Sequence, residues 1–197
     1  MIDTVVFDIG GVLAEWNPEK GMRAMGFSEE TIQVLMEKIF RAIWLSCDEK
    51  RYTEDGIRAY FKSVVPGYEK EVDVIWDELP KISTEFPYSC DWIRELKARG
   101  KKVYLLSNYN NISFEKNSVN YHFLSLVDGR VVSYELEAVK PSPVIFEHLL
   151  KKYDIDPEKA VFLDDNKDNI AGAIRMGMKG IVFSSYEQAR AELEQYL

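Results

Sequence analysis

The chain has 197 residues, of which 46% are apolar and 29% charged, and 33 acidic against 25 basic side chains give a net charge of −8. This composition is typical of a globular protein and excludes a disordered chain. The length fits one domain, or one domain with an inserted segment, and is enough to bury a full core. The acid excess argues against nucleic-acid binding, because such proteins present a basic face.

Cysteine usage and the N-terminal sequence favour a soluble cytoplasmic protein. Cys47 and Cys90 lie far apart and form no Cys-x-x-Cys pair, so we expect both to stay reduced. The first eight residues lack the basic region of a secretory signal. No apolar run approaches the ~20 residues that span a membrane. We therefore expect a monomer or weak homodimer with no membrane or nucleic-acid partner.

The N-terminal half begins with one strand and then reads as helical. A short apolar run over residues 4–7 predicts a buried strand, and Gly10-Gly11 after it predicts a tight loop. Residues 17–86 follow with helical periodicity. One helix is expected to begin at the cap residue Ser28 and to continue to Trp44, because its apolar residues recur every three or four positions. A second helix follows Thr53, and a third covers residues 72–79.

From residue 87 onward, helices and strands alternate. Strands are expected at 103–106, 131–132, 160–163 and 180–183, and helices at 92–96, 144–153, 170–174 and after Ser185. This alternation predicts a parallel sheet with helices on both faces. The fold class is therefore α/β, a Rossmann-like three-layer core. We expect residues 1–16 and 87–197 to form this core, and residues 17–86 to form an inserted, all-helical cap.

Polar side chains lie at four expected strand ends, the segment Val139-Lys140-Pro141 being counted as one of them. They are Asp8, Ser107, Asn108, Lys140, Asp164 and Asp165. Ligands of parallel sheets bind outside the carboxyl ends of the strands, so these side chains are expected to form one site. Three carboxylates and one ammonium leave two negative charges, which a Mg²⁺ ion would neutralise. A metal and a lysine around a carboxylate suit phosphoryl transfer.

The same residues carry a resemblance to a known family. Four motifs occur in order: Phe7-Asp8-Ile9-Gly10-Gly11-Val12-Leu13, Leu105-Leu106-Ser107-Asn108, Lys140-Pro141 and Phe162-Leu163-Asp164-Asp165-Asn166. Over nearly the whole chain they resemble the haloacid dehalogenase-type (HAD) hydrolases, most of which are phosphatases. The helical block corresponds to the inserted cap of subfamily I in this family.

The resemblance implies roles for the motif residues. Asp8 would be the nucleophile that takes the phosphoryl group as an aspartyl-phosphate, which splits one difficult step into two. Lys140 would steady Asp8 and the phosphate. Ser107 and Asn108 would bind phosphate oxygens of a small phosphorylated metabolite.

The loop after Asp8 would contribute to the metal site, and it also departs from the family pattern at Gly10. Mg²⁺ would be held by Asp8, Asp164, Asp165 and the backbone carbonyl of Gly10. Typical phosphatases of the family have a second aspartate at the position of Gly10, where it protonates the leaving group and later activates water. Such acid–base catalysis contributes roughly 10²–10⁴-fold. Its absence predicts a low rate, a substitute group, or a leaving group that needs little help.

The first motif also resembles a subgroup with D-x-G-N-V sequences, which includes bacterial α-glucose-1-phosphate phosphatases. An anomeric phosphate leaves as a hemiacetal, which needs less protonation than a simple alcohol. A sugar phosphate such as glucose 1-phosphate is therefore a hypothesis for the substrate.

The cap contains further candidate residues. Asp48, Glu49 and Tyr52 lie in a polar loop between two predicted helices, where caps of this family tend to reach the substrate. Trp16 is a candidate contact as well. Trp44 lies in an apolar stripe, so we expect it in the core of the cap.

Two alternative functions remain open at this point. A 2-haloacid dehalogenase of the same superfamily also lacks the second acid, but it works without metal, which leaves Asp164 and Asp165 without a purpose. A decayed phosphatase would bind Mg²⁺ and phosphate without turnover. Dependence of activity on magnesium separates these alternatives from a phosphatase.

Overall fold

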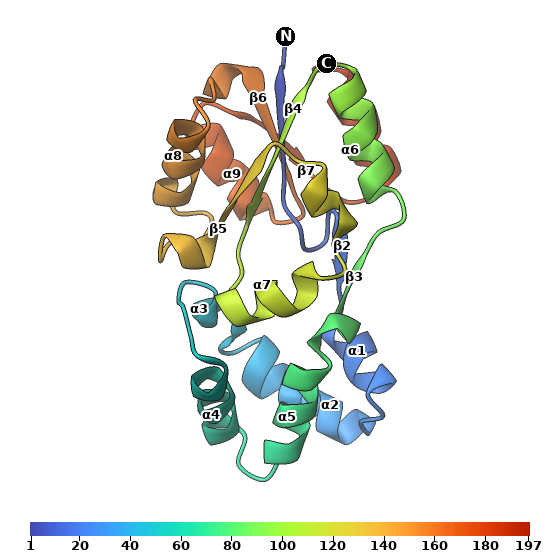
Figure 1. The fold of residues 1–197 in the computed structure, drawn as a ribbon, viewed down its shortest axis with the longest axis vertical. Helices are drawn as coiled ribbons and strands as arrows, with labels where there is room; N and C mark the ends of the chain where they lie inside the picture. Colours follow the sequence, from blue (N-terminus) through green and yellow to red (C-terminus); the bar gives the residue numbers. More distant parts are fainter.

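The computed structural model describes residues 1–197 and has a five-stranded parallel sheet in the order β5-β4-β1-β6-β7 (Figure 1). The strands are β1 (Thr4–Phe7), β4 (Lys102–Ser107), β5 (Gly129–Val132), β6 (Ala160–Asp164) and β7 (Lys179–Val182). The central strand β1 pairs with both neighbours, so that Phe7 lies beside Leu105 of β4 and Leu163 of β6. This register brings the carboxyl ends of the three inner strands to one edge.

Helices cover both faces of the sheet and complete the predicted three layers. One face packs on α6 (Ser89–Ala98) and α10 (Tyr186–Glu194), and the other on α8 (Pro143–Lys152) and α9 (Lys167–Arg175). Side chains alternate between the faces along each strand. Val5 packs in the apolar cluster of the first face with Trp92, whereas Val6 packs in that of the second face with Phe146. The α/β fold class is thereby confirmed.

Residues 17–86, which we call the cap, form a helical body below the sheet in Figure 1. Its α-helices are α1 (Pro18–Ala24), α2 (Glu29–Leu35), α3 (Trp44–Cys47), α4 (Glu54–Val64) and α5 (Glu69–Asp77). Ser28 and Thr53 cap α2 and α4 through their hydroxyl oxygens, as expected. Fourteen buried apolar residues of the cap form a cluster with Ile112, separate from the two clusters on the sheet. The division into core and cap at residues 16/17 and 86/87 stays a prediction.

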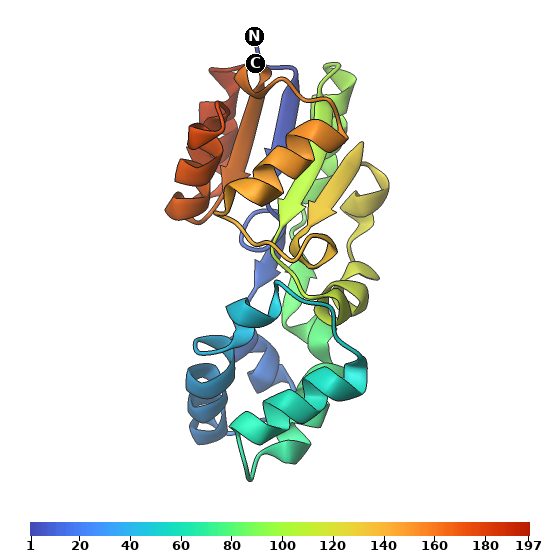
Figure 2. The same cartoon turned by 90° about the vertical axis from the view of Figure 1, so that its left-hand side faces the viewer.

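A two-stranded antiparallel ribbon joins the sheet to the cap and was not predicted. It consists of β2 (Ala14–Trp16) and β3 (Ser83–Glu85), with Trp16 opposite Ser83. Three-residue strands are too short to give an alternation pattern in the sequence. The ribbon puts the entry and the exit of the cap side by side (Figure 2).

The expected helix from Ser28 to Trp44 is wrong in its second half. Helix α2 ends at Leu35, and a π-helical turn follows at Met36–Phe40, where the Arg41 amide donates to the Met36 carbonyl at 2.9 Å. Residues 41–43 then form a turn before α3. Apolar spacing cannot distinguish these wider turns from a regular helix, and π-turns often occur at functional sites.

Helix α7 (Asn111–Ser118) lies between sheet and cap (Figure 1) and was also not expected. Its buried residues include Asn111, Ser113 and Asn117, so it lacks the one-sided apolar stripe that marks a helix. Ile112 joins the apolar cluster of the cap, and Phe114 joins a cluster of the sheet. The helix therefore connects the two bodies.

Both chain termini lie at the end of the sheet that points away from the cap (Figures 1 and 2). Cys47 and Cys90 are free thiols. None of the helices combines the length and the apolar character that crossing a membrane requires.

Candidate active site

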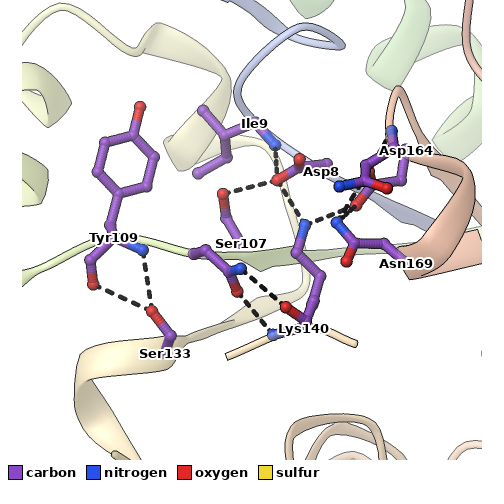
Figure 3. Close-up of polar contacts among 10 residues, drawn as sticks. Asp8, Ile9, Ser107, Tyr109, Ser133, Lys140, Asp164 and Asn169 are labelled. Carbon is purple, nitrogen blue, oxygen red and sulfur yellow. Dashed lines mark hydrogen bonds and ion pairs between the residues drawn. The ribbon is translucent and has the colours of Figure 1, made fainter. Parts of the chain in front are cut away.

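The sheet edge that faces the cap gathers the predicted polar residues (Figure 3). Asp8 follows β1, Ser107 ends β4 and Asp164 ends β6. Lys140 enters from the segment before α8. A cavity of about 300 Å³ lies at this edge, and its walls come from both the sheet loops and the cap.

The two oxygens of the Asp8 carboxylate have different surroundings. Oδ1 accepts hydrogen bonds from the Ile9 amide at 2.7 Å and from the Ser107 hydroxyl at 2.7 Å, and it pairs with Lys140 Nζ at 2.9 Å. Oδ2 accepts no hydrogen bond from the chain. Burial raises the pKa of Asp8 to about 7, with Lys140 opposing the rise and Asp164 adding to it. Three donors thus hold one oxygen in place, and the other oxygen has no partner in the chain.

Lys140 lies between two buried carboxylates and is only 3% exposed. Its ammonium contacts Asp8 at 2.9 Å and Asp164 Oδ2 at 2.7 Å. Burial alone would lower the pKa of Lys140, but the two aspartates outweigh burial and hold it above its usual range. Lys140 therefore stays charged.

The Asn108 side chain positions the backbone of Lys140. Its Oδ1 accepts from the Lys140 amide at 2.9 Å, and its Nδ2 donates to the Lys140 carbonyl at 3.2 Å. Ser107 is likewise engaged, because its hydroxyl donates to Asp8. Both residues line the cavity, and their predicted contact with phosphate oxygens stays a prediction.

Three carboxylates at this edge fit a divalent cation. One oxygen each from Asp8, Asp164 and Asp165 lies within 4.8 Å of the others. Asp164 is fully buried, and both of its oxygens accept from Asn169 Nδ2 at 3.0–3.1 Å. Burial raises the pKa of Asp165, and the charge of Asp164 adds to that effect. A hard cation with oxygen ligands, as Mg²⁺ is, would relieve this repulsion. Gly10 lines the same cavity, and the role of its backbone carbonyl as a ligand of the ion stays a prediction.

Of the three candidate residues in the cap loop, Asp48 lines the cavity, and Glu49 and Tyr52 do not. Asp48 Oδ1 accepts from the Asn110 amide at 3.0 Å and from Asn110 Nδ2 at 3.4 Å. Burial raises the pKa of Asp48 to about 7, against the effect of these hydrogen bonds. The Tyr52 backbone instead pairs with the Asn111 side chain, at 2.8 and 3.0 Å.

The family can be decided from the sequence match. The model of the haloacid dehalogenase-like hydrolases matches residues 2–177, which contain all the motif residues described above. The chain belongs to the haloacid dehalogenase-like hydrolases. The parallel sheet with Asp8 at the end of its central strand is consistent with this assignment.

Relatives and solved structures of this HAD hydrolase cover almost its whole length. It is 25% identical to a sesquiterpene phosphatase of Aspergillus oryzae, over 96% of this chain and 94% of the relative. It is 27% identical to a D-ribitol-5-phosphate phosphatase of Bacteroides thetaiotaomicron, over 86% of each chain. A HAD family enzyme of the latter organism, solved with magnesium and inorganic phosphate, has a similar fold. Its TM-score is 0.73 at 23% identity, and the match covers 95% of this chain and 98% of that one.

Several cavity residues of this HAD hydrolase were not singled out from the sequence. Phe40 and Leu45 line the cavity from the cap, and Tyr109 lines it from the segment after β4. Trp44, expected in the cap core, is 7% exposed and belongs both to that core and to the cavity wall. Trp16, a candidate contact, also lines the cavity. Trp16, which follows the first motif closely in the chain, was the sequence signal for this wall.

Proposed function

We propose that this HAD hydrolase is a Mg²⁺-dependent phosphatase that hydrolyses a small phosphorylated metabolite through an aspartyl-phosphate on Asp8. The observation that carries the proposal is the asymmetric Asp8 carboxylate. Three donors hold Oδ1, and Oδ2 has no partner in the chain. A nucleophile held in this way needs little reorganisation before attack. Two relatives named as phosphatases support the same reaction.

In the proposed reaction Asp8 Oδ2 forms a bond to phosphorus while the ester oxygen leaves. Lys140 keeps a positive charge beside Asp8 and thereby stabilises the charge that builds up on the phosphoryl group. Ser107 and Asn108 line the cavity where phosphate oxygens would lie. Asp8, Asp164, Asp165 and the Gly10 carbonyl would hold Mg²⁺, which supplies positive charge to the transferring group when bound. Water then attacks phosphorus and restores Asp8.

The relatives share the phosphatase reaction but are named for different substrates. One relative is named for a terpene phosphate and another for a polyol phosphate. The sugar phosphate suggested by the first motif remains a hypothesis, and glucose 1-phosphate is its most direct test.

The test measures phosphate release from a panel of phosphomonoesters, with Mg²⁺ and with EDTA. The panel includes p-nitrophenyl phosphate, glucose 1-phosphate and glucose 6-phosphate. We expect release that depends on Mg²⁺ and that falls to background in Asp8→Asn. The control is Asp55→Asn, which removes an exposed carboxylate of α4 outside the cavity and should keep full activity.

Other outcomes overturn the proposal. Activity that survives in Asp8→Asn would exclude Asp8 as the nucleophile. Halide release from a chloroacid without metal, and no phosphate release, would identify a dehalogenase. Binding of Mg²⁺ and phosphate without turnover would identify a decayed enzyme.

A further inference from the structure

The cavity has two chemically different sides. The sheet side is polar and carries the carboxylates and Lys140. The opposite side, formed by β2 and the cap, consists of Trp16, Phe40, Trp44, Leu45 and Asp48. Asp48 is the one charged group on that side, and no cation lies there. The group attached to the phosphate would therefore meet mainly hydrocarbon.

Three aromatic rings form a continuous surface on the cap side, which we call the aromatic wall (Trp16, Phe40 and Trp44). Phe40 stacks on Trp44 with ring centres 4.9 Å apart, and Trp16 lies 5.1 Å from Trp44. Trp44 in turn stacks on the buried Trp76 at 5.8 Å. Packing against the cap core fixes the wall in place before any ligand binds.

The rim of the cavity continues this apolar character. Leu45 lies beside the aromatic wall and is 62% exposed. One exposed leucine is ordinary on a surface, but at the mouth of a cavity lined by rings it extends an apolar binding surface. A sugar placed here would leave several hydroxyl groups without partners, which disfavours its binding.

We propose that the preferred substrates are phosphate monoesters of apolar alcohols, with the hydrocarbon part packed on the aromatic wall and Leu45. This proposal rests on the proposed phosphatase activity and names its substrate class. Removal of a methylene group from water contributes about 0.8 kcal/mol, which corresponds to roughly a fourfold change in kcat/KM. The phosphate ester of an apolar alcohol should thus have a much higher kcat/KM than the ester of a polar alcohol of equal size.

The experiment compares kcat/KM for methyl, butyl, hexyl and phenyl phosphate with that for glucose 1-phosphate and glucose 6-phosphate, all with Mg²⁺. We expect kcat/KM to rise about threefold to fourfold per methylene until the cavity is filled. Hexyl phosphate should exceed glucose 6-phosphate at least tenfold, because both are esters of primary alcohols and differ mainly in polarity. Leu45→Gln and Phe40→Ala should flatten the rise. Val119→Gln, at a residue that is 75% exposed and outside the cavity, is the matched control.

A flat series, or a kcat/KM for glucose 6-phosphate that equals that for hexyl phosphate, would overturn this substrate class while the phosphatase activity stands. An unchanged rise in both Leu45→Gln and Phe40→Ala would also overturn it. Absence of release from every ester, p-nitrophenyl phosphate included, would instead refute the phosphatase itself.

A second, independent observation concerns the acid that Gly10 cannot supply. Asp48 is 4% exposed, and its Oδ1 is occupied by two hydrogen bonds from Asn110. Its Oδ2 makes no hydrogen bond in the chain and is not sealed from solvent. Because Asp48 and Asp8 line the same cavity, a phosphate ester held at Asp8 lies within the space that Asp48 borders. A carboxyl with one fixed oxygen and one open oxygen is suited to proton transfer.

We infer that Asp48 is the general acid and base of the reaction. In the first step Asp8 Oδ2 bonds to phosphorus, the bond from phosphorus to the ester oxygen breaks, and the Asp48 proton moves to that oxygen. In the second step a water oxygen bonds to phosphorus and the bond to Asp8 breaks. The proton of that water returns to Asp48, so that phosphate leaves and both carboxyl groups are restored. The pKa of Asp48, near 7, allows both transfers at neutral pH.

The test is pre-steady-state hydrolysis of p-nitrophenyl phosphate by Asp48→Asn. Nitrophenolate leaves without a proton, so the first step should stay fast, whereas hydrolysis of the aspartyl-phosphate loses its base. We expect a burst of about one equivalent of nitrophenolate, followed by turnover that is 10²–10⁴-fold slower than in the wild type. Butyl phosphate, which needs the acid, should give no burst and an equally large loss.

A merely structural role for Asp48 predicts a different result. Both steps would slow together for both esters, without a burst, and this would overturn the inference. Unchanged turnover of butyl phosphate in Asp48→Asn would overturn it as well. A wild type inactive on every ester would point to failure of the proposed function instead.

Discussion

Replacing Asp48 by asparagine should make the protein more stable at alkaline pH. Burial raises the pKa of this carboxyl from 3.8 to about 7, Asp8 adds to the rise, and Asn110 and Lys140 oppose it. The folded chain therefore binds the Asp48 proton more tightly than the unfolded chain does. It follows that this group makes the wild type progressively less stable as the pH increases from about 4 to about 7. A difference of about 3 pKa units corresponds to about 4 kcal/mol.

Asparagine carries no charge and keeps an Oδ1 that can accept from the Asn110 amide. We expect Asp48→Asn and the wild type to have equal free energies of unfolding at pH 4. At pH 8 the free energy of unfolding of the variant should be higher by up to about 4 kcal/mol. This difference corresponds to a melting temperature that is higher by about 10 °C. Urea unfolding in EDTA at pH 4, 6 and 8 measures the difference. The titration of Asp8 occurs in both proteins and largely cancels.

Asp55→Asn is the control, because Asp55 is exposed in the first turn of α4. It should differ from the wild type by less than about 1 kcal/mol at every pH. The reasoning is refuted if Asp48→Asn and the wild type have equal free energies of unfolding at pH 8. It is also refuted if the difference between these free energies does not change with pH. If Asp48 is retained for catalysis, its replacement by asparagine should raise stability and lower activity.

Three further substitutions test the site and its supports. Lys140→Met leaves two buried aspartates without their cation and should cost about 3–5 kcal/mol in EDTA, measured by urea unfolding; unchanged stability would contradict the ion pairs. Gly11→Ala would place a Cβ 2.4 Å from Asp165 Oδ2, at a φ of +74°, and should weaken Mg²⁺ binding in calorimetry; an unchanged Kd would argue against Asp165 as a ligand. Asn111→Ala removes both hydrogen bonds to the Tyr52 backbone and should cost about 1–3 kcal/mol, with faster hydrogen exchange at Tyr52; unaltered exchange would contradict this contact.

The sheet and the polar side of the site could be predicted because their signals are local. Strands β1, β4 and β6 are short apolar runs with a polar residue at their end or directly after it, and strand direction alone brings Asp8, Ser107 and Asp164 to one edge. Lys140 was also expected at a strand end, and that placement is wrong, because no strand ends there and the residue enters from the segment before α8. Only the structure shows which oxygen of the Asp8 carboxylate is held by hydrogen bonds.

The cap side could not be predicted in the same way, because its features depend on contacts between distant segments. The partners of Asp48 are Asn110 and Ser133, which lie 62 and 85 positions away. Helix α7 buries polar residues, so the apolar period that identifies helices is absent. The π-helical turn at Met36–Phe40 has the same apolar spacing as an α-helix and differs only in its hydrogen bonds.

The β2–β3 ribbon has a consequence for how such a protein can diversify. Because Trp16 and Ser83 are paired, the two ends of the inserted segment lie side by side. A change in the length or sequence of the insert therefore need not displace the strands of the sheet. Loop-closure entropy changes slowly with length, so a lineage can exchange the insert while the reacting aspartate and lysine stay in place. The exchange is still constrained, because Asn110 and Ser133 of the sheet loops bind Asp48 of the insert. New substrate ranges in this lineage should therefore be accompanied by changes at those two positions.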